Sequence, residues 1–154
     1  MVSRVVYTGG TFDLFHTGHV NFLMQCAKIA GKGQVVVSLN TDEFIVAYKG
    51  SPPLFSYKER KIILESCRYV SWVMPNNGGS DSKPAILSVA PDFIVIGSDW
   101  ACKDYYAQMN FTQEWLDNKG IVLIYVPYTK GISSTDLRKR LWNDPDKRSN
   151  TDQI

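Results

Sequence analysis

Five short apolar runs, spread along nearly the whole chain, constrain the fold more than any other feature of the sequence. Each is four to six residues long, rich in valine and isoleucine, and bounded by polar or glycine residues. Continuous apolar runs of this length are typical of strands that are buried on both faces of a parallel sheet. We predict strands over Val5–Thr8, Val35–Leu39, Tyr69–Met74, Asp92–Ile96 and Ile121–Val126.

Helical patterns alternate with these runs. Ser56 and Glu59 have the spacing of a capping box, in which two side chains satisfy free amides at a helix start. The residues that follow the second strand look different: Asn40–Glu43 reads as a polar turn, and Ala47–Pro53 reads as a loop because it contains glycine and two prolines. We predict helices over Thr17–Gly31, Ser56–Cys67, Lys83–Val89, Tyr105–Asn118 and Ser133–Trp142.

This alternation of strands and helices predicts an α/β fold. We expect a single doubly wound, Rossmann-like domain over residues 1–142, with a five-stranded parallel sheet and helices on both faces. The length of 154 residues fits one domain of this kind. Residues 143–154 are polar and are expected to form a flexible tail.

Charge and cysteine content narrow the classes of function. The formal net charge is +2, which is too small to indicate a nucleic-acid partner by itself. No apolar run approaches the ~20 residues of a membrane-spanning helix, so no membrane insertion is expected. The three cysteines are widely spaced, form no C-x-x-C pair and follow no signal peptide. They predict reduced thiols in a cytoplasmic protein.

The connection between the first strand and the first helix concentrates the most chemistry. Gly9 and Gly10 permit a phosphate to approach the backbone closely, and the helix after them offers free N–H groups. Neither G-x-G-x-x-G nor G-x-x-x-x-G-K-[ST] is present, which disfavours NAD and P-loop binding. Both histidines of the chain, His16 and His19, lie here with Gly18 between them. Their spacing places the two imidazoles on one face of the helix.

Two imidazoles at a helix N-terminus are suited to donate hydrogen bonds to phosphate oxygens as charge develops. A metal pair is the alternative, but no third histidine and no nearby cysteine completes a ligand set. Polar turns also follow the other strands, and ligands of doubly wound sheets lie beyond the carboxyl ends of the strands. We therefore expect these turns to converge on one phosphate-binding crevice.

Two segments near opposite ends of the chain resemble the motifs of a known superfamily. Gly10–His19 is similar to the H-x-G-H motif of the nucleotidyltransferases, and Gly131–Thr135 is similar to their I-S-[ST]-[ST] turn. Three further segments resemble the cytidylyltransferases, most closely those that act on glycerol 3-phosphate: Ser56–Arg60, Arg68–Val70 and Gly97–Trp100. The resemblance covers the chain from Val5 to Leu141.

The resemblance implies transfer of CMP from CTP to a small phosphorylated alcohol, with glycerol 3-phosphate as the first candidate and with pyrophosphate released by direct in-line attack. It also implies a homodimer and a Mg²⁺ ion that is bound mainly through nucleotide phosphates, with no metal ligand assigned to the protein. The catalytic residues that it implies are His16, His19 and Lys49. The nucleotide-binding residues that it implies are Gly10, Thr11, Phe12, Gly18, Arg68, Gly97, Asp99, Trp100, Thr129, Gly131, Ile132, Ser133, Ser134 and Thr135. The acceptor-binding candidates are Asp13, Arg60, Lys83 and Lys130.

The chain departs from the family pattern next to the second motif. The family sequence R-T-E-G is Tyr128–Gly131 here, so Tyr128 replaces an arginine that contacts phosphate in the relatives. Lys130 is a candidate to supply the missing charge, and Ser98 replaces the first acidic residue of G-D-D-W. These departures leave the acceptor open, and the sequence also leaves open the choice between CTP and ATP and the oligomeric state. An ATP-dependent adenylyltransferase and a non-catalytic nucleotide-binding module are the alternatives.

Overall fold

A computed structural model describes residues 2–79 and 81–143, except for the side chain of Trp100. Its five strands form one all-parallel sheet with the order β3-β2-β1-β4-β5. The strands are β1 (Val5–Gly10), β2 (Gln34–Asn40), β3 (Trp72–Asn76), β4 (Phe93–Gly97) and β5 (Val122–Val126). This topology confirms the predicted doubly wound α/β fold. The order reverses at β1, which places a crevice beyond its carboxyl end.

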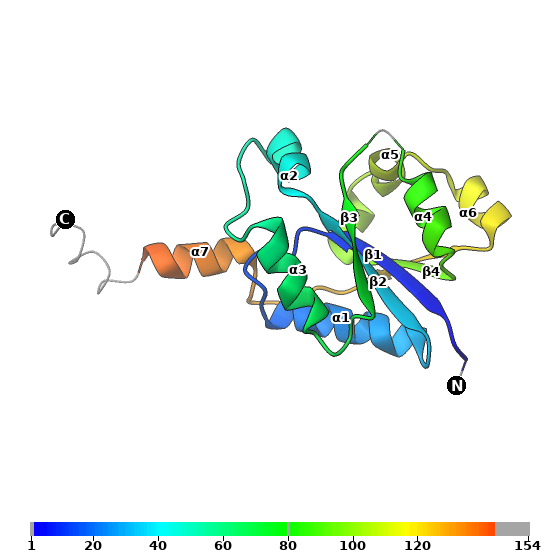
Figure 1. Cartoon of the computed structure of the whole chain (residues 1–154), viewed down its shortest axis with the longest axis horizontal. Helices are drawn as coiled ribbons and strands as arrows, with labels where there is room; N and C mark the ends of the chain where they lie inside the picture. Colours follow the sequence, from blue (N-terminus) through cyan, green and yellow to red (C-terminus); the bar gives the residue numbers. More distant parts are fainter. Residues whose placement is uncertain (1, 80, 144–154) are drawn as a thin grey trace, which may run out of the picture.

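Helices cover both faces of the sheet, and each face has its own apolar core (Figure 1). On one face, α1 (Thr17–Ala30) and α3 (Tyr57–Glu65) pack against the strands through buried residues such as Leu23 and Leu64. On the other face, α4 (Lys83–Val89), α5 (Tyr105–Met109) and α6 (Gln113–Lys119) pack against β1 and β4. Alternate residues of a strand serve the two cores, as Val6 and Tyr7 do in β1.

Helix α2 (Asp42–Lys49) corrects the predicted turn and the start of the predicted loop after the second strand. Thr41 accepts a hydrogen bond from the amide of Phe44 and so caps the helix, and Gly50 ends it in a left-handed conformation. The polar residues after β2 are therefore a helix N-terminus. The predicted capping box of the next helix is present, because Ser56 and Glu59 each accept from the other's amide.

Two other predicted boundaries were wrong. The helix expected over Tyr105–Asn118 is two helices, because Asn110 adopts a left-handed conformation and Thr112 caps a new start. The third strand begins at Trp72 rather than Tyr69 and continues through Pro75. Proline is tolerated there because β3 lies at the edge of the sheet. The residues after β4 form a short 3₁₀ helix, Ser98–Cys102.

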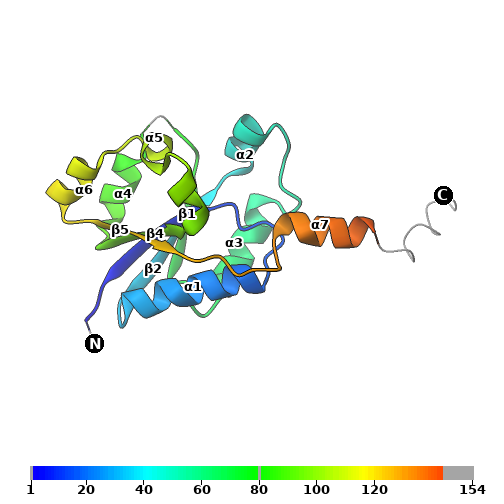
Figure 2. The same cartoon turned by 180° about the vertical axis from the view of Figure 1, so that it is seen from behind.

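Helix α7 (Ser134–Trp142) extends away from the rest of the chain, as both views show (Figure 1, Figure 2). It has no buried residue, and Trp142 is 82% exposed. The predicted polar tail lies outside the described residues beyond Asn143. None of the helices described is long and apolar enough to cross a membrane.

Candidate active site

A large cavity opens at the carboxyl end of the sheet, where the polar turns were predicted to converge. Its volume is about 1010 Å³, at the upper end of the ~300–1,000 Å³ typical of ligand pockets. Residues at or just after the ends of all five strands line it: Gly10, Asn40, Asn76, Gly97 and Tyr128. The cavity therefore has room for more than one small ligand.

The histidine pair lies at the start of α1, where backbone amides fix the orientation of both rings. His16 is the N-cap residue, and its Nδ1 accepts a hydrogen bond from the amide of Gly18 at 3.0 Å. His19 Nδ1 accepts from the amide of His16 at 3.3 Å, and the two rings stack with centroids 3.9 Å apart. A side chain at position 18 would collide with the His16 ring, because a Cβ there would lie 2.8 Å from it. Glycine at this position is therefore a requirement of the histidine geometry.

Burial keeps both imidazoles neutral. It lowers the pKa of His19 to about 3, with a smaller contribution from the neighbouring His16 and an opposing one from Asp13. Burial also lowers the pKa of His16. In a neutral imidazole only one ring nitrogen carries hydrogen, and Nδ1 of each ring is already an acceptor. Each ring therefore carries its proton on Nε2 and can donate it in a hydrogen bond.

The N-terminus of α7 borders the same cavity. Ser133 caps this helix by accepting from the amide of Asp136 at 3.0 Å, and Gly131 provides the left-handed turn before it. Ser134 Oγ donates to the carbonyl of Asp13 at 2.7 Å. This bond fixes the second motif beside the connection that carries the histidines. The two predicted motifs thus meet, and Thr129, Ile132, Ser133, Ser134 and Thr135 all line the cavity.

Asp13 joins three segments that lie far apart in the sequence. Its carboxylate accepts from the amides of Leu54 at 2.8 Å and Phe55 at 3.0 Å, and from Arg138 Nη2 at 2.7 Å. Burial alone would raise the pKa of Asp13, but these two amides and the guanidinium outweigh it and hold the pKa below its ordinary value. Asp13 lines the cavity wall, although its carboxylate is engaged by the protein, which places it as a brace rather than a free acceptor ligand.

Arg138 lines the cavity and was not among the residues predicted from the sequence. It lies on α7, one turn after Ser134, and its side chain is 53% exposed. Lys130, which was the candidate to replace the arginine missing at Tyr128, is exposed and does not line the cavity. The sequence places Arg138 in a basic run with Lys139 and Arg140, so nothing local distinguishes it from a solvated surface charge.

Lys49 also lines the cavity. It is the last residue of α2, and its ammonium lies 5.4 Å from the centre of the Tyr48 ring. Tyr48 also lines the cavity, and its hydroxyl forms a hydrogen bond with Thr11 Oγ1 at 3.3 Å. Thr11 and Phe12 of the first motif also line the cavity, next to Gly10.

The end of β4 and the segment after β5 form another wall. A Cβ at Gly97 would lie 2.5 Å from the Tyr128 ring, so only glycine leaves space for this tyrosine. Burial and the Asp99 carboxylate raise the pKa of Tyr128 to about 12, which keeps the phenol protonated at neutral pH. Asp99 lines the cavity, and its Oδ1 is buried without a hydrogen-bond partner. Trp100 follows in the 3₁₀ helix, and its side chain lies outside the described part of the structure.

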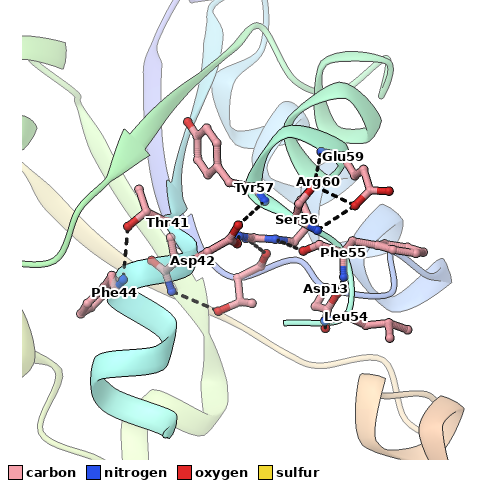
Figure 3. Close-up of polar contacts among 12 residues, drawn as sticks. Asp13, Thr41, Asp42, Phe44, Leu54, Phe55, Ser56, Tyr57, Glu59 and Arg60 are labelled. Atoms are coloured by element: carbon pink, nitrogen blue, oxygen red, sulfur yellow. Dashed lines mark hydrogen bonds and ion pairs between the residues drawn. The ribbon is translucent and has the colours of Figure 1, made fainter. Parts of the chain in front are cut away.

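Arg60, an acceptor-binding candidate from the sequence, instead supports the fold. Its side chain is fully buried and donates to the carbonyls of Thr11 at 2.7 Å and Phe55 at 2.9 Å, and to Asp42 at 2.7 Å. Figure 3 shows the guanidinium between Asp42 and Phe55. Arg60 therefore supports the start of α2 and the loop before α3 from behind the cavity wall.

Two further predicted residues also lie elsewhere. Lys83 bonds to the carbonyl of Asn110 at 2.6 Å and to Asp81 at 3.0 Å, although its neighbours Ser82 and Pro84 line the cavity. Arg68 precedes the amino end of β3, at the opposite edge of the sheet, where its guanidinium lies over the Tyr69 ring. Neither position gives geometric support to the acceptor contact expected of Lys83 or to the nucleotide contact that the resemblance implied for Arg68.

Two side-chain amides, the buried Asn40 and the half-buried Asn76, line the cavity and were not predicted from the sequence. Asn40 at the end of β2 donates to Thr11 Oγ1 at 3.1 Å, and Asn76 at the end of β3 donates to Asn40 Oδ1 at 2.7 Å. These residues lie 36 positions apart and become neighbours only because β2 and β3 pair in register. The apolar runs predicted both strands but not this register.

Protein ligands for a metal ion are sparse in this region. Among the residues that the structure describes, no group of three or more His, Cys, Asp or Glu side chains is arranged to hold a metal. The carboxylates that line the cavity are Asp13, Asp81 and Asp99, and each forms an ion pair with a basic side chain. This donor set suits a Mg²⁺ ion that keeps water and phosphate oxygens as its ligands.

Comparison with known proteins agrees with this geometry. Residues 7–140 match the family model described as cytidylyltransferase-like. The chain is 36% identical to the glycerol-3-phosphate cytidylyltransferase of Bacillus subtilis over 138 residues, covering 90% of this chain and 97% of that protein. It is 31% identical to the enzyme of the same name from Staphylococcus aureus, covering 89% and 94%. A crystal structure of a lipopolysaccharide core biosynthesis protein from Thermoplasma volcanium has the same fold, with a TM-score of 0.63, 23% identity, and 85% and 100% coverage.

Proposed function

We propose that this chain, which belongs to the cytidylyltransferase-like family and is a nucleotidyltransferase, transfers CMP from CTP to a small phosphorylated alcohol. The observation that carries the proposal is the meeting of two helix N-termini at one cavity. One carries the neutral His16 and His19, and the other carries Ser133 and Ser134. Helix N-termini favour phosphate through their free N–H groups and their dipoles.

In the proposed reaction an anionic phosphate oxygen of the acceptor attacks the α-phosphorus of CTP. A new P–O bond forms on one side, and the bond to the bridging oxygen breaks on the other, so pyrophosphate leaves with the electron pair. The attacking oxygen is already deprotonated, so the step needs no general base. The protein contributes positioning and charge stabilisation.

The two histidines supply donors whose direction is fixed before the substrates bind. Nδ1 of each ring is engaged by a backbone amide, so the Nε2–H groups of His16 and His19 are the donors for oxygens around the α-phosphorus. Because burial keeps both rings neutral, they act by hydrogen bonding and do not transfer a proton. Lys49 and Arg138, on helices α2 and α7, supply positive charge to the cavity.

The base would occupy the wall formed by Gly97, Asp99 and Tyr128. Gly97 leaves room for the Tyr128 ring, which offers the base an aromatic surface, and the buried Asp99 Oδ1 without a partner suits the amino group of a base. We further propose glycerol 3-phosphate as the acceptor, because relatives of that name cover nearly the whole chain. The proposal includes the Mg²⁺ ion held through nucleotide phosphates, a homodimer, and a cytoplasmic setting that suits the free thiols of Cys26, Cys67 and Cys102.

Release of pyrophosphate from CTP tests the proposal, with glycerol 3-phosphate, other phospho-alcohols, and ATP in place of CTP. Turnover of CTP is the expected result. Turnover of ATP alone would assign an adenylyltransferase, and calorimetric CTP binding without turnover for any acceptor would assign a regulatory module. Loss of one transition-state donor in His16→Ala should lower kcat about 10²–10³-fold. A decrease of less than threefold would contradict the role given to this residue.

A further inference from the structure

The cavity has two wings of different chemistry on either side of β1. Toward β4 and α5 it is lined by Ile96, Gly97, Tyr105 and Met109, which offer apolar and aromatic surface. Toward β2, β3 and α2 its lining includes four neutral polar side chains, Thr11, Asn40, Tyr48 and Asn76, beside the apolar Phe44, Ile45 and Pro75. In-line attack requires the acceptor and the leaving pyrophosphate on opposite sides of the α-phosphorus. A base fits the apolar wing, so the polar wing remains for the acceptor.

The side chains of the polar wing form one continuous hydrogen-bonded chain. It runs from the hydroxyl of Tyr48 to Thr11 Oγ1 at 3.3 Å, from there to Asn40 Nδ2 at 3.1 Å, and from Asn40 Oδ1 to Asn76 Nδ2 at 2.7 Å. The amide of Gly78 closes it by donating to Asn76 Oδ1 at 3.2 Å. Both amide groups are thereby fixed in orientation before any ligand binds.

This chain leaves hydrogen-bonding capacity unused. An amide nitrogen has two hydrogens and an amide oxygen has two lone pairs. Asn40 and Asn76 each use one hydrogen and one lone pair in the chain, and within the described residues their side chains make no second hydrogen bond. A ligand hydroxyl both donates and accepts, so it can satisfy the remaining N–H and oxygen positions together.

The wing is also unsuited to a positively charged acceptor. The carboxylates that line the cavity are Asp13, Asp81 and Asp99, and each is paired with a cation of the protein. A quaternary or primary ammonium group would find neutral amides and hydroxyls in this wing, with the cationic Lys49 nearby. An uncharged polyol that carries phosphate meets no such repulsion, and its phosphate gains from the same lysine.

We propose that Asn40 and Asn76 select the acceptor by binding its hydroxyl groups, and that the acceptor is therefore a phosphorylated polyol without a cationic group. Thr11 and Tyr48 act as positioning residues for the two amides. This inference rests on the proposed function, because it names the part of the same site that recognises the second substrate.

The test compares glycerol 3-phosphate with propyl phosphate, which lacks both hydroxyls, and with phosphocholine. Binding is measured by calorimetry with and without CTP, and kcat/KM is measured by pyrophosphate release. The variants are Asn76→Leu, which keeps the side-chain size but removes the amide, and Tyr48→Phe, which removes one hydroxyl. The matched controls are Asn118→Leu and Tyr125→Phe, both exposed and away from the cavity.

We expect the wild type to prefer glycerol 3-phosphate over propyl phosphate by at least about 100-fold, since a site built to bind a hydroxyl rejects the analogue that lacks it. Asn76→Leu should reduce this preference about tenfold or more, and Tyr48→Phe about threefold, while propyl phosphate and CTP bind as in the wild type. The controls should leave the preference unchanged.

Two results would overturn the inference: a preference that is the same in Asn76→Leu and the wild type, or phosphocholine bound as tightly as glycerol 3-phosphate. If Asn76→Leu releases pyrophosphate and keeps the wild-type preference for glycerol 3-phosphate over propyl phosphate, only the role of the amides is refuted. Absence of CTP turnover with every acceptor would remove the proposed function instead. Calorimetry would then still decide the amide role, because the acceptor preference is read from binding alone.

Discussion

The depressed pKa of His19 makes the stability of this fold depend on pH in a calculable way. The pKa is about 3 in the folded protein because the ring is buried, against 6.5 for an unperturbed histidine. The unfolded chain therefore binds more protons than the folded chain between these two values. The contribution of His19 to stability is complete above pH 6.5 and is lost progressively as the pH falls toward 3.

The size of the stability loss follows from how far the pH lies below the pKa of His19 in the unfolded chain. One pH unit in this window corresponds to about 1.36 kcal/mol, so lowering the pH from 7 to 5 should cost about 2 kcal/mol through this ring alone. The contribution of Asp13, whose folded pKa is lowered below 3.8, is lost only at more acidic pH. Burial also depresses the pKa of His16, so part of the total change persists when His19 is replaced.

Urea unfolding at pH 7 and pH 5, followed by tryptophan fluorescence, measures this difference in the wild type and in His19→Asn. Asparagine does not titrate, and its Oδ1 can take the place of Nδ1 as acceptor for the His16 amide. We expect the wild type to lose about 2 kcal/mol more than the variant between the two pH values. Equal losses in the two proteins would show that the ring is not buried as described.

The other predictions concern charge and packing. Arg60→Met removes the guanidinium that donates to one carboxylate and two carbonyl oxygens, and it should lower the free energy of unfolding by about 3–5 kcal/mol. The adjacent surface variant Lys61→Met should change it by less than about 1 kcal/mol. Equal effects of the two variants in urea unfolding would argue against the buried role of Arg60. Lys49→Gln should raise the Kd for CTP about tenfold at low salt, and a calorimetric titration at 0.5 M NaCl should show a smaller difference. Gly97→Ala should cost about 1–3 kcal/mol by forcing its Cβ into the Tyr128 ring, and adding Tyr128→Ala should recover much of that loss; additive losses would rule out the contact.

Local patterns predicted most of the fold because the central strands β2, β1 and β4 are largely buried on both faces. Val35–Leu39 is apolar at nearly every position, so its identity as a strand does not depend on any partner. Helix α2 escaped prediction because its capping residue, Thr41, follows a strand directly and resembles a turn. The break at Asn110 depends on a left-handed backbone that no local pattern required.

The candidate site was predictable where it consists of contiguous motifs. His16, Gly18 and His19 form a unit whose geometry depends on residues within the same turn. Arg138 and the pair of Asn40 and Asn76 were not predictable, because their placement depends on strand register and on contacts across the chain. Polar residues such as Asn40 and Arg138 are recognisable as part of the site only once the fold shows which residues they contact.

The bond between Ser134 and Asp13 also has a consequence for how the protein is made. These residues are 121 positions apart, so the halves of the phosphate-binding site leave the ribosome at different times. At roughly 5–20 residues per second, the histidine-bearing connection waits on the order of 6–24 s for its counterpart on α7. During synthesis the nascent chain can form β1, α1 and β2, yet it has no complete site. The cavity wall is therefore completed late in synthesis, when Ser134 and Arg138 of α7 form their bonds to Asp13.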